Sequence, residues 1–341
     1  MTLRQSFACA VGSVALIQIS AAHISIAYAA DMQPVLKAPP LEQQATGYVE
    51  IYSGWAGTHV RQTECFSIVC DSETFRLNGW ALGGAGRGNY WITRNTSVQV
   101  DAQAEGTSYD NPGGGGRTSN HSYLVGGHWS WRDPQQYLFG LFAAAGDAGG
   151  GFSVSGPQRH ALIGGEAQWY WSQFTLYAQG GYDSTLGNIG STERGVEKER
   201  VHAWFIRGTG RYFVNPNFLI EGTVMYANGA IDYNLGVPSL NFQTWTWQAK
   251  AEWRFPTAPF SVYAKYQGSE TKFDLVSFSA AFDKVTDHRV LFGLKLHLGD
   301  RTLQQADRTG ATLDIIDPLS NPTSPLMFGG EAFRPDAEPG G

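Results

Sequence analysis

A strict alternation of apolar and polar residues runs through residues 242–255 and constrains the fold more than any other feature of the chain. The apolar positions are Trp245, Trp247, Ala249, Ala251, Trp253 and Phe255, and the polar ones are Thr244, Thr246, Gln248, Lys250, Glu252 and Arg254. Successive side chains of a β-strand point to opposite faces, so the segment predicts a strand with one apolar and one hydrated face. A soluble sandwich would rarely tolerate charges on the other face of every strand together with so much tryptophan. Lipid outside and water inside fit the pattern better.

The first residues of the chain have the features of a secretory signal peptide. Arg4 supplies a positive charge, residues 7–19 are mostly apolar, and residues 27–29 read Ala-Tyr-Ala, a small-residue cleavage pattern. We expect cleavage near Ala29 and a mature chain that begins at Ala30. A membrane anchor is the alternative, but the apolar stretch is short and contains polar residues. No later apolar run has the length of a spanning helix, so this chain would cross a membrane with strands.

Composition argues against three broad classes of protein. Of the 341 residues, 42 are glycine, 11 are tryptophan, 13% are aromatic and only 16% are charged, which is unlike an average soluble enzyme. The mean hydropathy of -0.24 is far too low for a helical membrane protein. The net charge of -6, with no basic stripe or recognition motif, argues against nucleic acid as a partner.

Twelve segments of the mature chain alternate in the manner of strands. We expect strands near residues 47–56, 74–84, 96–107, 121–132, 136–146, 159–171, 173–183, 201–213, 218–228, 242–255, 260–269 and 287–298. Short connections that carry turn residues, such as 133–135 and 215–217, alternate with long polar ones, such as 57–73 and 184–200.

This rhythm predicts both the fold class and the domain organisation. Outer-membrane barrels combine an even number of antiparallel strands with short periplasmic turns and long outer loops. We therefore expect an all-β, transmembrane, antiparallel up-and-down β-barrel of about 12 strands in the bacterial outer membrane. The expected parts are a signal peptide (1–29), a periplasmic leader (30–45), the barrel (46–298) and a polar C-terminal tail (299–341).

Aromatic residues recur beside the short turns. The clearest are Trp129, Trp131, Trp169, Trp171, Trp253 and Phe255. Any single tryptophan is explained as well by core packing, but a set that recurs at turns predicts an aromatic girdle at the periplasmic interface.

Taking the polar face of each strand as inward places charges of both signs in the lumen. They are Glu50, Arg76, Asp101, Glu105, Arg132, Glu166, Asp183, Arg207, Arg211, Glu221, Lys250, Glu252, Arg254, Lys265, Arg289 and Lys295. A barrel of about twelve strands is much smaller than a wide-channel porin, so these side chains reach well into the lumen. Two outcomes stay open: paired charges nearly close the interior, or they line a narrow pore that selects small ions and polar solutes.

Cys65 and Cys70 are the cysteines that remain once the signal peptide is removed. An even pair in an oxidising compartment predicts a disulfide, which would stabilise the loop tip by about 2 kcal/mol in the chain-entropy model. We expect no metal site, because only His59 lies nearby in the sequence and the spacing is not that of a C-x-x-C pair.

The sequence gives no sign of catalysis. Residues His121, His128, His160, His202 and His297 join no serine in a recognisable motif. Asp101 and Glu105 lie four residues apart on one strand, too far for a dyad that shares a proton. Glycines 113–116 lack the continuation of a phosphate-binding loop, and we interpret glycines 83, 84, 86 and 88 as the end of a strand. We expect neither an enzyme nor a cofactor.

Two other segments leave alternatives open. Residues 273–282 carry several phenylalanines within the expected loop 270–286, where a loop should be hydrophilic. This loop could fold inward as a constriction, extend the strands above the membrane or present an apolar contact patch. The tail 299–341 could hang in the periplasm, plug the lumen or be disordered.

Two segments near the start of the mature chain carry a family resemblance: ADMQPVLKAPP at 30–40 and GYVEIYSGW at 47–55. They resemble the entry to porin-family outer-membrane β-barrels of alphaproteobacteria, which begins with a Met-Pro-Val-Lys-Ala-Pro-Pro-like segment. The resemblance implies an outer-membrane barrel that acts as envelope scaffold, surface antigen or small-solute pore, without catalysis or cofactor. The chain departs from the better-known small members, which look eight-stranded and end on an aromatic residue, because it has room for more strands and continues past Leu298.

The expected function is therefore a narrow non-specific pore for small solutes or a structural envelope barrel. The alternative is an adhesion or host-interaction protein whose closed barrel only displays its loops. The expected partners are outer-membrane lipid and lipopolysaccharide, the barrel-assembly machinery and small polar solutes.

Overall fold

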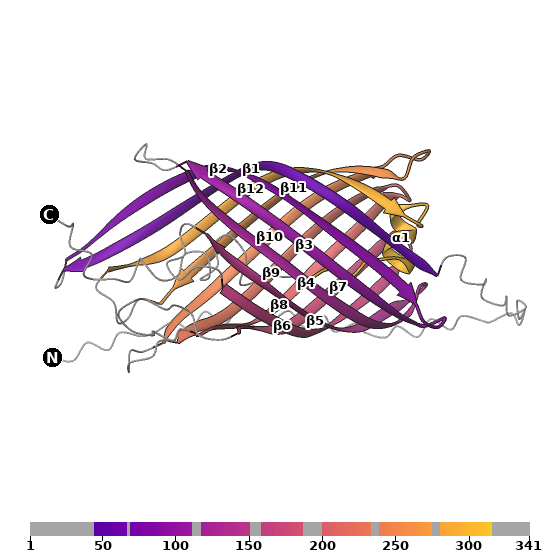
Figure 1. Cartoon of the computed structure of the whole chain (residues 1–341), viewed down its shortest axis with the longest axis horizontal. Helices are drawn as coiled ribbons and strands as arrows, with labels where there is room; N and C mark the ends of the chain where they lie inside the picture. The colour runs from indigo at the N-terminus through magenta and orange to yellow at the C-terminus, as the bar shows by residue number, and fades with distance from the viewer. Residues whose placement is uncertain are drawn as a thin grey trace, which may run out of the picture. The chain divides into compact units, whose positions relative to one another are not determined.

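Twelve antiparallel strands form a closed barrel in the computed structural model, which describes residues 44–66, 69–110, 117–150, 158–186, 200–232, 239–274 and 280–315 (Figure 1). All of these residues belong to one compact unit, 41–341. The strands are β1 (Ala45–Phe66), β2 (Val69–Trp91), β3 (Thr96–Asp110), β4 (Arg117–Asp133), β5 (Tyr137–Gly150), β6 (Gln158–Trp171), β7 (Phe174–Thr185), β8 (Arg200–Asn215), β9 (Phe218–Asp232), β10 (Leu240–Arg254), β11 (Phe260–Phe273) and β12 (Ala280–Leu298).

Each strand pairs with its neighbours in the sequence, and the barrel closes where β1 pairs with β12. The closing register runs from Gly47 opposite Leu298 to Glu64 opposite Ala280. Such closure leaves no unpaired strand edge in the apolar layer. The expected fold class, an up-and-down transmembrane barrel of twelve antiparallel strands, is confirmed.

The first hairpin is much longer than expected. Residues 57–73 were predicted to form a loop, but β1 and β2 stay paired as far as Phe66 opposite Val69. The prediction was wrong because polar residues follow one another on this extension, and the alternation that marks a strand in lipid disappears where both faces meet water. The glycines from Gly83 to Gly88 likewise lie inside β2 rather than at its end.

The two faces of the barrel differ as the alternation predicts. In β10, Trp245 and Trp253 on the outer face are 50% and 44% exposed, whereas Glu252 and Arg254 on the inner face are 2% and 5% exposed. The other predicted girdle tryptophans also lie on the outer face: Trp129, Trp131, Trp169 and Trp171. Phe255 packs against Trp253 with ring centroids 4.5 Å apart, beside the short turn that joins β10 to β11.

Aromatic side chains of the inner face lie over glycines on neighbouring strands. Tyr52 of β1 is opposite Gly83 of β2, and a Cβ at Gly83 would come within 2.4 Å of the Tyr52 ring. Tyr263 of β11 covers Gly293 of β12 in the same way, within 2.2 Å. Several of the glycines therefore make room for large rings in a narrow lumen.

One short helix follows the last strand: α1 (Leu303–Thr309). Within the described ranges, no helix has the length and apolar character needed to cross a membrane.

Candidate functional site

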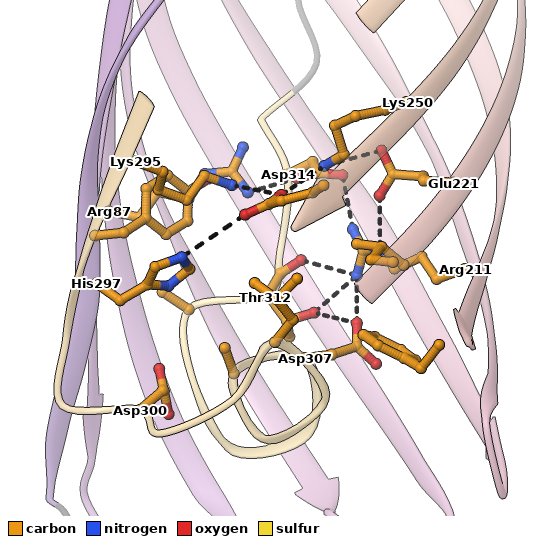
Figure 2. Close-up of a pocket in the computed structure, with 17 residues that line it drawn as sticks. Arg87, Arg211, Glu221, Lys250, Lys295, His297, Asp300, Asp307, Thr312 and Asp314 are labelled. Carbon is orange, nitrogen blue, oxygen red and sulfur yellow. Dashed lines mark hydrogen bonds and ion pairs between the residues drawn. The ribbon is translucent and has the colours of Figure 1, made fainter. Parts of the chain in front are cut away.

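The chain turns back into the barrel after β12. Gly299 has a φ of 101°, a left-handed conformation that glycine adopts without strain, and the Thr302 hydroxyl accepts a hydrogen bond from the Gln305 amide and caps α1. Residues 303–315, which we call the plug segment, then lie inside the lumen (Figure 2). Of the three placements considered for the tail, the structure thus shows the plug for this part. Residues 316–341 lie outside the described residues.

The helix α1 sits at the end of the barrel that carries the short turns. The amide of Gln304 donates to the Pro216 carbonyl at 3.1 Å, and its side chain donates to the Ser172 carbonyl at 2.8 Å. Both acceptors belong to short turns, between β8 and β9 and between β6 and β7. Leu303 packs against Phe213 and Leu219 of the wall.

The wall recognises the backbone of the plug segment as well as its side chains. The side-chain amide of Gln99 donates to the Leu313 carbonyl at 2.6 Å and accepts from the Leu313 backbone N–H at 3.2 Å. These are the two bonds that a neighbouring strand would make. Arg132 donates to the Gly310 carbonyl at 3.0 Å. These bonds satisfy backbone groups that enter the lumen without strand partners of their own.

Asp314 is the electrostatic centre of the plug segment (Figure 2). Its carboxylate lies 2.5 Å from Arg87, 3.2 Å from Arg207 and 3.0 Å from Arg211, which come from β2 and β8. Burial alone would raise the pKa of Asp314, but the three guanidinium groups outweigh it and hold this pKa well below its ordinary value. Asp314 is therefore ionised at any physiological pH.

Arg211 joins the plug segment to a second strip of the wall. It contacts Glu221 at 2.9 Å and Asp307 of α1 at 2.8 Å, and it donates to the Thr312 hydroxyl at 2.8 Å. Lys250 continues the strip, 3.3 Å from Glu221. The charges of β8, β9 and β10 and those of the plug segment form one connected network.

One side of the lumen is packed with apolar side chains. Ile315 lies in a buried cluster with Leu124, Phe142, Ala144, Leu162, Phe205, Met225 and Ala227. Leu313 lies in another with Leu138, Tyr170 and Tyr177. These residues come from β4 to β9, so the end of the plug segment packs against apolar side chains of these strands.

Two cavities lined by charged side chains lie beside the plug segment. One, of about 70 Å³, lies between α1 and the wall, and the other, of about 150 Å³, reaches Lys265 and Gln103. The residues that line both cavities are Tyr48, Arg87, Glu221, Lys250, Lys295 and Asp314. The two cavities therefore adjoin at Asp314 and these shared residues.

The structure places most of the predicted lumen charges on the inner face. They are Glu50, Asp101, Glu105, Arg132, Glu166, Asp183, Arg207, Arg211, Glu221, Lys250, Glu252, Arg254, Lys265, Arg289 and Lys295. Arg76 is a correction, because it is exposed on the outer face while its neighbour Leu77 faces inward at 5% exposure. Near the rim, β2 carries polar residues on its outer face, so polarity no longer marks the inward direction there.

Most of these charges are paired within the barrel. His128 lies 2.8 Å from both Asp101 and Glu166, and Arg289 bonds to Glu105 and lies 3.0 Å from Asp287. Charge pairs of both signs are thus present along the wall of the lumen.

A serine, a histidine and an acid meet near the short turn between β10 and β11. The Ser261 hydroxyl is 2.9 Å from Nε2 of His297 and donates to Glu252 at 2.7 Å. Glu252 approaches that same histidine nitrogen, at 3.7 Å. In a catalytic triad the acid holds the other ring nitrogen, so this trio lacks the orientation that activates a serine.

The structure describes the other predicted features, the disulfide and the loop 270–286, only in part. The backbones of Cys65 and Cys70 are directly opposite each other in the first hairpin, but their side chains lie outside the described residues, and the disulfide stays a prediction. β11 runs to Phe273 and β12 starts at Ala280, so part of the expected loop 270–286 is strand. The part of the chain that the structure describes holds no group of three or more His, Cys, Asp or Glu able to bind a metal.

Sequence reasoning missed the plug-segment acids Asp307 and Asp314 and the inward Gln99. A signal was present: the charges expected in the lumen were slightly basic in sum, which calls for acidic partners from elsewhere in the chain.

Comparison with known proteins gives the fold but not a family. No protein-family model matches the sequence, and no curated protein matches it. An outer membrane channel from Pseudomonas putida F1 is similar in structure, with 12% identity, a TM-score of 0.54 and coverage of 76% of this chain and 97% of that chain.

Two further structures are less similar. A Pseudomonas aeruginosa FadL homologue has 9% identity and a TM-score of 0.41, with 75% and 90% of the two chains covered. The outer membrane protease OmpT from Escherichia coli has 12% identity and a TM-score of 0.35, with 74% and 97% covered. The first likeness shows the fold of an outer-membrane β-barrel, and these two scores are too low to support an inference.

Proposed function

We propose that this protein is a narrow outer-membrane channel for small polar solutes, closed in this state by the plug segment. The observation that carries the proposal is the pair of charged cavities that adjoin at Asp314. A barrel with only a structural role has no need of so many charged side chains on its inner face. The proposal includes export by a cleaved signal peptide and contact with outer-membrane lipid, lipopolysaccharide and the assembly machinery.

The contacts of the plug segment are those of a segment that can leave the lumen rather than of a permanent part of the core. Many of its partners are polar: Gln99, Arg132 and Arg211 bind it through hydrogen bonds that water can replace. Buried ion pairs give little net stability, because desolvation offsets much of their attraction. Three apolar anchors oppose release: Leu303, Leu313 and Ile315.

The leader and first strand favour a place among porin-like barrels of alphaproteobacteria. The leader lies outside the described residues, so this narrower assignment rests on the sequence alone. We also propose that the barrel performs no catalytic step, since Ser261, His297 and Glu252 have the wrong relative orientation for one.

Swelling of proteoliposomes tests the channel proposal. Vesicles with the whole chain should admit glycerol and arabinose slowly, whereas vesicles with a chain that ends at Gly299 should admit both quickly and exclude raffinose, because the barrel is narrow. If the shortened chain shows the heat-modifiable gel migration of a folded barrel but no swelling, the barrel is structural and the proposal fails.

The first hairpin favours a second candidate, display of a binding surface. β2 pairs with β3 only from Asn78 onward, so residues 69–77 extend beyond their neighbour. Cells whose barrel lacks residues 61–74 would adhere less to matrix-coated surfaces, with unchanged solute uptake, if display is the function. Adherence equal to that of the intact protein would remove this candidate.

A further inference from the structure

The ammonium group of Lys265 stands apart from the other lumen charges. Lys265 lies on the inner face of β11, directly opposite Lys250 of β10. Across the described ranges no carboxylate lies within ion-pair distance of it and no hydrogen bond to it is formed; its near neighbour is the Tyr52 ring, 5.0 Å from Nζ. Like charges at opposite positions of a strand pair destabilise it, so this arrangement needs compensation.

The neighbouring cations already share the available carboxylates. Lys250 lies 3.3 Å from Glu221, and Lys295 lies 3.5 Å from Glu50. Glu252 forms ion pairs with both lysines, at 3.5 Å from Lys250 and 3.2 Å from Lys295. Arg87 and Arg207 share Asp314. None of these carboxylates is left over for Lys265.

The cavity beside Lys265 is therefore rich in positive charge. Its lining holds five cations (Arg87, Arg207, Lys250, Lys265 and Lys295) and three carboxylates (Glu50, Glu221 and Asp314). The amides of Gln103 and Gln248 and the Tyr263 hydroxyl add neutral hydrogen-bonding groups. A charge taken out of bulk water costs free energy unless an opposite charge meets it.

We propose that this cavity binds one small oxyanion, a carboxylate or a phosphate, with Lys265 and Lys250 as its main cationic contacts. The cavity measures about 150 Å³. A cavity of roughly that volume accommodates a molecule the size of benzene, so a short dicarboxylate or inorganic phosphate fits it. If the proposed channel is correct, the site also gives its solute class, but anion binding requires no conduction.

Calorimetric titration of the purified whole chain in detergent tests the site. Succinate and inorganic phosphate are titrated separately at constant ionic strength, so that binding of one or the other identifies an organic or an inorganic oxyanion. At least one of them should bind with a stoichiometry near one. The variant K265M should bind it at least about tenfold more weakly, since a hydrogen bond to a charged group is lost.

The matched control is Lys272→Met, on the same strand. The Lys272 side chain is 65% exposed and pairs with Glu270 at 3.0 Å, away from the cavity. This variant should bind as the unmodified protein does. No binding of either anion, or an equal loss in K265M and K272M, overturns the proposal.

Thermal unfolding provides a second, independent readout. Without added anion, K265M should unfold at a higher temperature than the unmodified protein, because the repulsion with Lys250 is gone. Added anion should then raise the unfolding temperature of the unmodified protein alone. If K265M does not assemble, K265Q replaces it. An unfolding temperature that rises equally in both proteins also overturns the site.

Discussion

Asp314 makes more ion pairs with the wall of the barrel than any other described residue of the plug segment. Three arginines from two strands contact its carboxylate directly. Removing one partner from a buried charge network leaves the others unpaired, which costs more than the network itself contributes. The position of the plug segment should therefore depend strongly on this one side chain.

We expect Asp314→Asn to weaken docking of the plug segment by about 3 kcal/mol. Trypsin cleavage after Arg308, within α1, measures docking, and its rate should rise by roughly 100-fold if cleavage needs release. Asp110→Asn is the control, because Asp110 and its partner Arg117 are 69% and 75% exposed. Equal cleavage rates in the two variants would contradict the role of Asp314.

Asp300 should make stability depend on pH in the opposite sense to most carboxylates. Burial raises its pKa to about 7, and Arg254 and Arg132 only partly oppose this. Between the ordinary pKa of an aspartate and pH 7, the Asp300 carboxyl is protonated in the folded chain and ionised in the unfolded chain. The free energy of unfolding therefore grows as the pH falls from 8 to 5.

Urea unfolding at pH 8 and pH 5 tests this assignment. The unmodified protein should gain on the order of 2 kcal/mol relative to D300N as the pH falls. Comparing the two proteins cancels the contributions of the other titrating groups. A difference between them that stays constant with pH would show that Asp300 titrates normally.

At the scale of elements, the barrel is shaped by aromatic rings that lie over glycines. The Tyr52 ring occupies the space above Gly83, and its hydroxyl donates to Glu105 at 3.0 Å. Gly88, on the same strand, has open space where a Cβ would point and is exposed on the outer face. Gly83 is thus required by the Tyr52 ring, whereas a larger side chain would fit at Gly88.

Gly83→Ala should lower the free energy of unfolding by about 1–3 kcal/mol, because the Tyr52 ring would have to move. Gly88→Ala should be neutral or stabilise by about 0.5 kcal/mol, since it only reduces the freedom of the unfolded chain. Unfolding in lipid vesicles compares them. Equal effects would mean that the ring does not fix this part of β1 and β2.

The elements were largely predictable from the sequence because lipid imposes alternation. Each expected strand is present, and β10 has the faces that Trp253 and Glu252 indicate. The rule fails where lipid is absent. It misses the extended first hairpin, places Arg76 on the wrong face, and gives no information about residues 303–315, whose partners are scattered over the wall of the barrel.

The apolar lumen cluster could have been anticipated from β5. Its sequence, YLFGLFAAAGDAGG, is apolar on both faces, which predicts a strand that is covered on both sides. The two-sided pattern indicates a filled lumen at Phe142, although it does not say what fills it.

At the scale of the whole molecule, the lumen holds both apolar and charged regions. Apolar side chains of β4 to β9 pack around Ile315, and a charged cavity lies beside Lys250 and Lys295. All strand pairings of the barrel lie within residues 45–298. The barrel should therefore assemble without the plug segment, and a chain that ends at Gly299 should keep heat-modifiable migration on a gel. Migration unaffected by boiling would show that the chain after Gly299 is needed for closure.

Single-channel recording in a planar bilayer tests the central claim most directly. The whole chain and the chain that ends at Gly299 are inserted separately, with heat-modifiable migration as the check on folding. The account predicts long closures with brief openings for the whole chain and a steady open conductance for the shortened one. Identical traces from the two proteins, whether silent or conducting, would contradict the claim that residues 303–315 close a channel.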